Sequence, residues 1–183
     1  MNTRSVGTTS SIRNDMEEAI RIMENMKNYD ASGFAIQLKF WVKELDFFNN
    51  TLVEKHPEKD ASLTTYHISE SKRPTEGQVA YFNLRRGYPK ELYDGHQCYI
   101  LKDFGLKLLI IPTTSVKGDS APLDEEFEMD IKIKNFENDL PTRLQFSDIR
   151  SIDAQRINEK RAIYDVETDR TLILGKVKKV LTL

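Results

Sequence analysis

Apolar residues recur at helical spacing in the first part of the chain and at strand spacing after it. The first helix is predicted over 14–29, with a start that resembles a capping box because Asn14 is followed three positions later by Glu17. Residues 1–13 before this helix are rich in Ser and Thr and lack periodicity, which predicts a disordered terminus.

A second helix is predicted over 34–52, after a break at 30–33. Apolar residues recur in it at alternating steps of four and three, namely Phe34, Leu38, Trp41, Leu45, Phe48 and Leu52. Such a stripe can pack on the first helix, on the following domain, or on the same helix of a second copy. We therefore expect 14–55 to be a helical hairpin extension and 56–76 to be a polar linker with a short possible strand at 63–68.

From Gly77 onward the periodicity is that of strands. Predicted strands cover 77–84, 97–102, 106–112, 127–133 and parts of 143–157. A glycine at position 105 supplies the turn of an apolar hairpin. The chain is predicted to end in a helix capped by Thr168 or Asp169, with an apolar face of Leu172, Ile173, Val177, Val180 and Leu181. Short strands without a βαβ rhythm predict an α+β fold, with a small closed or partly closed barrel over 77–183.

Composition and net charge argue against some classes of protein. The chain is 39% hydrophobic and 31% charged and has no apolar run near the roughly 20 residues that cross a bilayer, so we expect a soluble protein without membrane contact. Its first residues lack the apolar stretch of a secretory signal, which favours a cytoplasmic location. A net charge of −2 gives no overall attraction to nucleic acid, so RNA binding would need a local basic patch.

The cysteine and the histidines give little sign of redox or metal chemistry. The single cysteine, Cys98, cannot form an internal disulfide and lies in a strand-like run, which favours a buried thiol. His56, His67 and His96 have no Cys or carboxylate at metal-ligand spacing, so neither a metal ion nor another cofactor is expected.

The order of motifs after Gly77 resembles a known family. An opening strand is followed by a loop with Glu91 five residues before His96, by the apolar hairpin, by the Pro-x-Thr-Ser sequence at 112–115, by an amphipathic strand, and by IRSIDAQRI at 149–157. This order resembles the PemK/MazF family of toxin endoribonucleases from type II toxin–antitoxin systems. Residues 1–72 lie outside the resemblance, since the usual family member is a bare barrel domain.

The resemblance implies an SH3-like barrel with a C-terminal helix, usually a homodimer with an RNA groove at its interface. The implied partners are single-stranded RNA and a cognate antitoxin protein. The implied reaction is metal-independent cleavage by attack of a 2′-hydroxyl on the neighbouring phosphate. Such a reaction needs a proton acceptor, a proton donor, and cations or hydrogen-bond donors for the charge that builds on phosphorus.

The resemblance also implies catalytic residues. The family's hydroxyl position matches Thr114 or Ser115, and the family's arginine position is occupied by His96. Histidine is well suited to proton transfer near neutral pH, whereas loss of an arginine that binds phosphate in a bidentate manner could leave a domain that only binds. Glu91 occupies the acidic loop position, where it could orient His96 or an RNA base.

Nearby cations complete the predicted site. Arg85 and Arg86 could replace the missing positive charge, and Lys90 and Arg73 could add contacts to the RNA backbone. The alternative function is a non-catalytic SH3-like binding module whose helical extension serves oligomerisation or partner docking. The loss of the family arginine and the near-neutral net charge favour this alternative.

Overall fold

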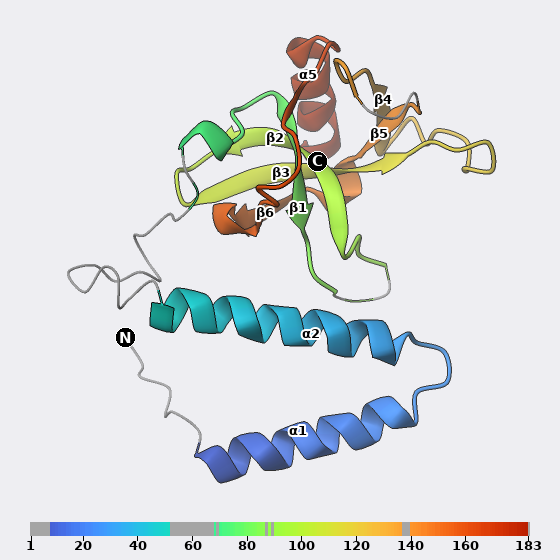
Figure 1. Cartoon of the computed structure of the whole chain (residues 1–183). Coiled ribbons are helices and arrows are strands. Elements are labelled where there is room, and N and C mark those ends of the chain that lie inside the picture. The colour runs from blue at the N-terminus through green and yellow to red at the C-terminus, as the bar shows by residue number, and fades with distance from the viewer. Residues whose placement is uncertain are drawn as a thin grey trace. The chain divides into compact units, whose positions relative to one another are not determined.

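The structure, a computed structural model, describes residues 8–51, 68, 70–86, 88, 90–136 and 140–182. The chain divides into two compact units, 1–45 and 46–183. The fold is α+β, with two N-terminal helices, a curled antiparallel half-barrel sheet and a C-terminal helix (Figure 1).

The helical unit is an antiparallel pair formed by α1 (Thr9–Glu24) and α2 (Ala31–Asp46) (Figure 1). α1 begins five residues before the predicted Asn14, because the Thr8 hydroxyl oxygen accepts the Ser11 backbone N–H at 3.2 Å and caps the helix. Residues 9–13, predicted to be disordered, thus form the first turns of α1. Neither helix contains a buried residue.

α2 is shorter than predicted. It ends at Asp46, and the five residues Phe47–Thr51 continue as a π-helical turn, η1. Apolar side chains remain exposed on α2, including Phe40, Trp41 and Val42 at 47, 42 and 58%. None of the described helices is long and apolar enough to cross a membrane.

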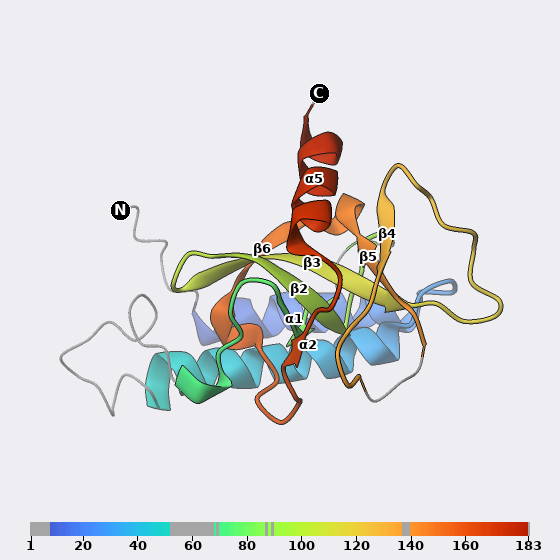
Figure 2. The ribbon, with the colours of Figure 1, turned by 90° about the horizontal axis from the view of Figure 1, so that it is seen from above.

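The sheet of the second unit has β3 as its organising strand (Figures 1 and 2). Its strands are β1 (Gln78–Asn83), β2 (Gly95–Asp103), β3 (Lys107–Ser115), β4 (Glu128–Ile131), β5 (Thr142–Gln145), β6 (Arg150–Asp153) and β7 (Tyr164–Asp165). The hydrogen-bonded order is β4-β5-β3-β2-β1-β7, and β6 also pairs with β3. Along one side β3 pairs with β2; along the other, residues 107–110 pair with β6 and 113–115 with β5. This change of partner divides the sheet and accompanies its curl.

The predicted apolar hairpin is confirmed as β2 and β3. Gly105, with φ +86°, occupies the turn in a conformation that side chains with a Cβ rarely adopt. Both faces of the hairpin are covered, because Ile100 and Ile110 belong to one apolar cluster and Tyr99 and Ile111 to another. Double coverage explains why these strands are continuous apolar runs rather than alternating ones.

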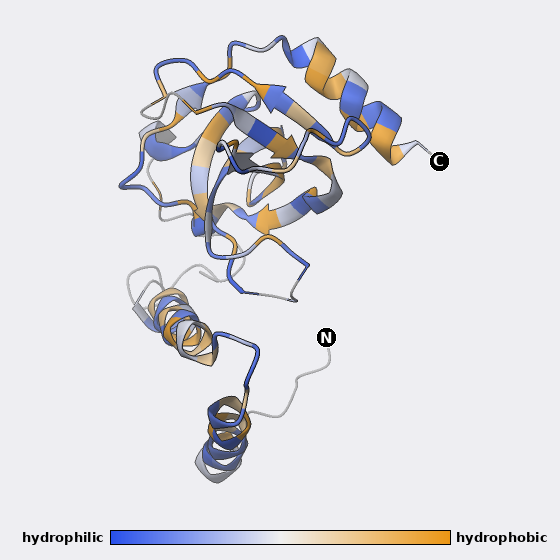
Figure 3. Ribbon diagram, turned by 90° about the vertical axis from the view of Figure 1, so that its right-hand side faces the viewer, coloured by the Kyte–Doolittle hydropathy of each residue, from blue (hydrophilic) through white to orange (hydrophobic). Residues whose placement is uncertain are grey.

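The C-terminal helix, α5 (Arg170–Leu181), closes the second cluster. The Asp169 carboxylate caps it by accepting the Thr171 backbone N–H at 2.8 Å, as predicted. Ile173 is fully buried, and Figure 3 shows apolar and polar stretches alternating along the helix. The predicted apolar face is partly wrong, since Leu172 and Leu181 are 59 and 60% exposed.

Between the helical unit and β1, only some residues are described. Ile68 is buried, and a short 3-10 turn, η2, covers Glu70–Lys72. The rest of the possible strand at 63–68 lies outside the described residues.

Candidate functional site

A pocket of about 450 Å³ opens where β2 begins and β3 ends, and we call it the strand-end pocket. From β2 and β3 it is lined by Gly95, His96, Gln97, Thr113, Thr114 and Ser115. The structure therefore brings together His96, Thr114 and Ser115, three of the four residues that the sequence suggested for the catalytic chemistry, whereas the fourth, Glu91, does not line the pocket.

Strand register explains this convergence. Cys98 pairs with Pro112, so continuing the antiparallel register by two residues sets His96 opposite Thr114. On its other side His96 pairs with Phe82 of β1, which is fully buried. The histidine backbone is thus held between two strands, and the half-buried residue is part of the pocket lining.

The hydrogen bond of the His96 ring sets its tautomer. Its Nδ1 lies 3.1 Å from the Thr113 carbonyl oxygen, which can only accept a hydrogen bond. Nδ1 must therefore carry the proton, and in the neutral ring Nε2 is the atom with the available lone pair. A histidine in this tautomer can accept a proton at Nε2.

The two hydroxyl residues are not equivalent. Neighbouring residues of a strand point to opposite faces, so Thr114 and Ser115 present their hydroxyls in different directions. The Thr114 Oγ1 accepts a hydrogen bond from Gln145 Nε2 at 3.1 Å, and the same nitrogen donates to Glu128 Oε1 at 3.0 Å. Ser115 is exposed at the strand end. Thr114, opposite His96 and held by Gln145, has the more defined geometry.

Two cations of the pocket come from segments that sequence reasoning did not select, Lys117 and Arg161. Lys117 follows β3, and Arg161 lies between β6 and β7. No local motif marks Arg161, because only the tertiary fold brings the segment after β6 next to β1; Lys117 lies two residues after Ser115, and its position there was a signal that the sequence offered.

Three aromatic rings, Tyr81, Phe136 and Tyr164, also line the pocket. The Arg161 guanidinium carbon lies 5.4 Å from the centre of the Tyr81 ring, within cation–π range. Phe136 and Tyr164 meet edge to face with their centres 5.0 Å apart. Aromatic faces of this kind are the surfaces on which single-stranded nucleic acids stack their bases.

The described lining of the pocket carries a net positive charge, although the whole protein has a net charge of −2. Among its described lining residues, Lys117 and Arg161 are cationic and none is Asp or Glu. A concave surface with charges of one sign concentrates oppositely charged ligands. The strand-end pocket therefore favours an anion such as a phosphate group.

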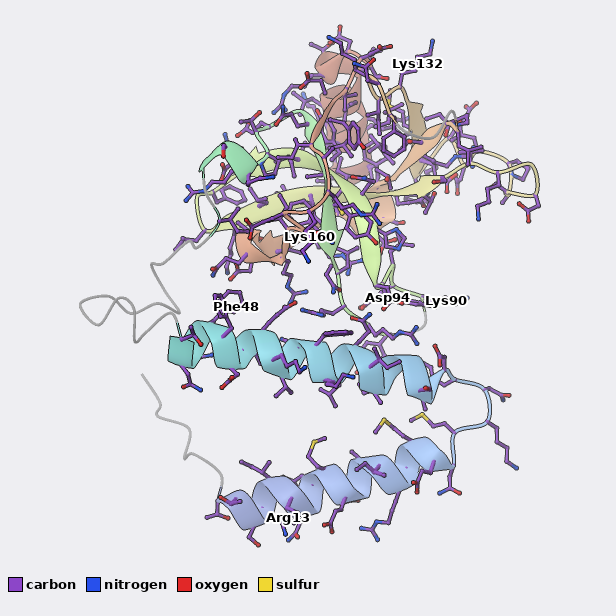
Figure 4. The ribbon with its side chains drawn as sticks, viewed as in Figure 1. Arg13, Phe48, Lys90, Asp94, Lys132 and Lys160 are labelled. Atoms are coloured by element: carbon purple, nitrogen blue, oxygen red, sulfur yellow. The ribbon has the colours of Figure 1, made fainter. Side chains whose placement is uncertain are left out.

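Glu91 and Lys90 lie elsewhere, on the loop between β1 and β2 (Figure 4 labels Lys90 and, at the end of this loop, Asp94). Both side chains are exposed, and neither lines the pocket. The Glu91 carboxylate accepts the Tyr88 backbone N–H at 3.3 Å, a contact within the loop itself. No described contact joins Glu91 to His96.

The predicted arginines also lie outside the pocket lining. Arg85 is buried, with φ +66° at the start of the β1–β2 loop. Arg86 pairs with Asp94 at 3.1 Å and lies 5.1 Å from the Tyr93 ring centre. Arg73 donates through Nε to the Ile68 carbonyl oxygen at 3.3 Å. The contacts of Arg86 and Arg73 are made within the loops that carry them, and the positive charge of the described pocket lining comes from Lys117 and Arg161 instead.

Cys98 is fully buried, as the sequence predicted. Burial raises the pKa of its thiol, because a thiolate would lose its hydration there. In the described part of the chain no group of three or more His, Cys, Asp or Glu residues could hold a metal ion. His56 and His67 lie outside the described residues.

A second pocket, of about 500 Å³, adjoins the first. The two share Phe136 and Thr142, and the second also includes Lys132, Asn135 and Glu167. An extended ligand in the strand-end pocket would thus find a neighbouring hollow beyond Phe136.

Comparison with known proteins finds no matching protein-family model and no matching curated protein. The resemblance to PemK/MazF therefore remains a prediction from the order of motifs.

Proposed function

We propose that residues 77–183 form a PemK/MazF-like domain of the SH3-like barrel type that cleaves single-stranded RNA without a metal ion. The observation that carries the proposal is the lining of the strand-end pocket. His96 and Thr114 stand there with two cations and three aromatic rings, in the absence of any carboxylate among the described lining residues. Phosphate, ribose hydroxyl and base each have a chemically matched partner in that set.

In the proposed reaction, the 2′-oxygen forms a bond to phosphorus and the bond from phosphorus to the 5′-oxygen breaks. The proton of the 2′-hydroxyl passes to Nε2 of His96, and the leaving 5′-oxygen takes a proton from water. Lys117 and Arg161 neutralise the charge that builds on the phosphate oxygens, where the Thr114 hydroxyl donates a hydrogen bond. The products are a 2′,3′-cyclic phosphate and a 5′-hydroxyl end.

The proposal includes the biological setting that the resemblance implies. The domain would be the toxin of a toxin–antitoxin pair, acting on cytoplasmic RNA as a homodimer and restrained by an antitoxin protein. His96 takes the place of the family arginine as the proton-transfer group. Arg161, from a different segment, supplies the cation that the arginine would have provided.

The test is incubation of the purified full chain with single-stranded RNA in EDTA. We expect cleavage to fragments with 2′,3′-cyclic phosphate ends, and a loss of about 100-fold or more in rate for His96→Ala, as for removal of a general base. Thr114→Ala and Arg161→Ala should also slow cleavage. Lys160→Ala is the matched control for Arg161→Ala, since Lys160 is the neighbouring cation, is exposed and does not line the pocket (Figure 4).

A second function, the non-catalytic binding module, is favoured by one contact. The Thr114 hydroxyl is already held by Gln145, which suits a structural role. RNA that binds without being cleaved would support this second function and contradict the first. Cleavage that is unchanged by both His96→Ala and Thr114→Ala would contradict the proposed mechanism.

A further inference from the structure

The second pocket, which adjoins the strand-end pocket, is largely apolar. Its volume is about 500 Å³, and half of its described lining residues are apolar, namely Ile131, Ile133, Phe136, Leu140 and Pro141. The proposed cleavage takes place in the strand-end pocket and leaves this second hollow without a role. Its position and its chemistry both bear on what it binds.

Strand register joins the two pockets. Thr142, the first residue of β5, pairs with Ser115 of β3 on one side and with Ile131 of β4 on the other. Directly opposite residues of neighbouring strands lie on the same face of a sheet, so these three residues form one row. Ser115 lines the strand-end pocket, Ile131 lines the second pocket and Thr142 lines both. The row extends over about 10 Å at the usual strand spacing.

Phe136 is the other residue that both pockets share. Its ring meets the ring of Tyr164 edge to face, and Tyr164 lines the strand-end pocket but not the second one. Close to this pair in sequence, the Lys134 backbone N–H donates to the Asp165 carbonyl oxygen at 2.8 Å. Backbone pairing next to the two rings therefore holds the boundary between the pockets.

The two linings differ in charge. The strand-end pocket has two cations and no carboxylate among its described lining residues. In the second pocket, the Asp130 carboxylate is already paired with Arg143 at 2.7 Å, and the other two charged residues, Lys132 and Glu167, are of opposite sign. A phosphate is therefore favoured in the strand-end pocket, whereas the apolar second pocket suits an uncharged base.

A phosphate that is cleaved joins two nucleosides, so a ribonuclease must accommodate a base on each side of it. We propose that the second pocket binds one of the two bases that flank the scissile phosphate of single-stranded RNA. The other base lies against the aromatic rings of the strand-end pocket. Stacking tolerates any base, because every base has a π-face. This inference rests on the proposed function, because it takes RNA cleavage in the strand-end pocket as its starting point.

The experiment measures kcat/KM of the full chain on short 2′-O-methyl RNA strands that contain a single ribonucleotide. Only this ribonucleotide has an attacking 2′-hydroxyl, so the position of the scissile phosphate is fixed. Each base in turn is then removed, with the sugar and the phosphates kept. We expect a loss of about tenfold for each of the two flanking bases, as one stacked base provides, and little loss for more distant bases.

Leu140→Glu tests the second pocket from the side of the protein. Leu140 lines the second pocket but not the strand-end pocket, and it is 43% exposed, so the variant should fold. We expect kcat/KM to fall about tenfold for the intact strand and to stay unchanged for the strand that already lacks the base of this pocket. Leu123→Glu is the matched control, because Leu123 is 39% exposed and lines neither pocket.

The abasic strands are tested on the unaltered protein and do not depend on the folding of a variant. Removal of a flanking base that costs no more than removal of a distant one would overturn the role of the second pocket. So would a Leu140→Glu variant that cleaves the intact strand normally, or one that loses activity equally on the intact and the abasic strand. Each of these results leaves the proposed function intact. Failure of the unaltered protein to cleave the intact strand would overturn both.

Discussion

At the scale of single residues, the packing of Gly95 against Tyr81 determines the shape of the strand-end pocket. A Cβ at position 95 would stand 1.9 Å from the Tyr81 hydroxyl oxygen and 2.4 Å from the ring carbon that bears it. The ring can lie where it does only because position 95 lacks a side chain. Both residues line the pocket, so the missing side chain at Gly95 determines where the Tyr81 ring stands in the lining.

We predict that Gly95→Ala displaces the Tyr81 ring and lowers the free energy of unfolding by about 1–3 kcal/mol, as overpacking usually does. Urea denaturation measures this loss. Gly118→Ala is the control, because a Cβ at Gly118 would meet nothing within 4 Å. If the two variants were equally stable, Tyr81 would have room to move without cost and the proposed constraint would be wrong.

Also at this scale, the sequence and the structure agree on some site residues only. His96, Thr114 and Ser115 were found from the order of motifs, and they do line one pocket. Arg161 was missed because it comes from a segment distant in sequence, whereas Lys117, two residues after Ser115, was passed over although it is close to the selected residues. Arg85 and Arg86 were chosen because they are close to His96 in sequence, yet neither lines the pocket.

At the scale of elements, α5 shows how one helix covers the sheet. Ile173 is fully buried against the cluster that contains Val79, Tyr99 and Ile111, while its neighbour Leu172 is 59% exposed. Periodicity suggested that both belong to the apolar face. The side on which α5 meets the sheet decides between two adjacent apolar residues.

We predict that Ile173→Ala lowers the free energy of unfolding by about 2–5 kcal/mol, because it removes buried methyl groups and leaves a cavity. Leu172→Ala, on the same helix turn, should change it by less than about 0.5 kcal/mol, as for an exposed position. The comparison requires only urea denaturation of the two variants. Similar losses in both would mean that α5 packs through a different face.

The pairing of β3 shows what local sequence pattern does not predict. The strand, its hairpin partner and the glycine turn were all predicted from local pattern. Its second edge is shared between β6 and β5, which come later in the chain. Local pattern carries no information on such pairing, because hydrogen bonds between backbones are the same for every residue except proline.

At the scale of the whole molecule, the helical unit presents apolar side chains without burying them. The stripe at alternating steps of four and three was predicted to pack within the chain or against a second copy. Of that stripe, Trp41 and Leu45 are 42 and 47% exposed. Exposed apolar surface of this kind favours association with another apolar surface.

We predict that the full chain forms a homodimer that buries part of the α2 stripe. Trp41 is the single tryptophan of the protein, so its fluorescence reports on α2 alone. Its emission should shift to shorter wavelength as protein concentration rises, together with a doubling of mass in sedimentation. Leu45→Glu in the stripe should shift the equilibrium to monomer, whereas Lys43→Glu, which places a glutamate on α2 outside the stripe and changes the charge even more, should not. A monomer at all concentrations would exclude the dimer.

The sequence by itself determined the local elements of this protein and the candidate chemistry at the ends of two strands. Spacing of apolar residues, a glycine at a turn and an aspartate at a helix start act over a few residues, and they placed the hairpin and α5. Only the tertiary structure decided that Arg161 joins the pocket lining and that Arg85 and Arg86 do not. Those properties arise where distant segments meet, since burial and cation–π contact depend on the groups that the fold brings near.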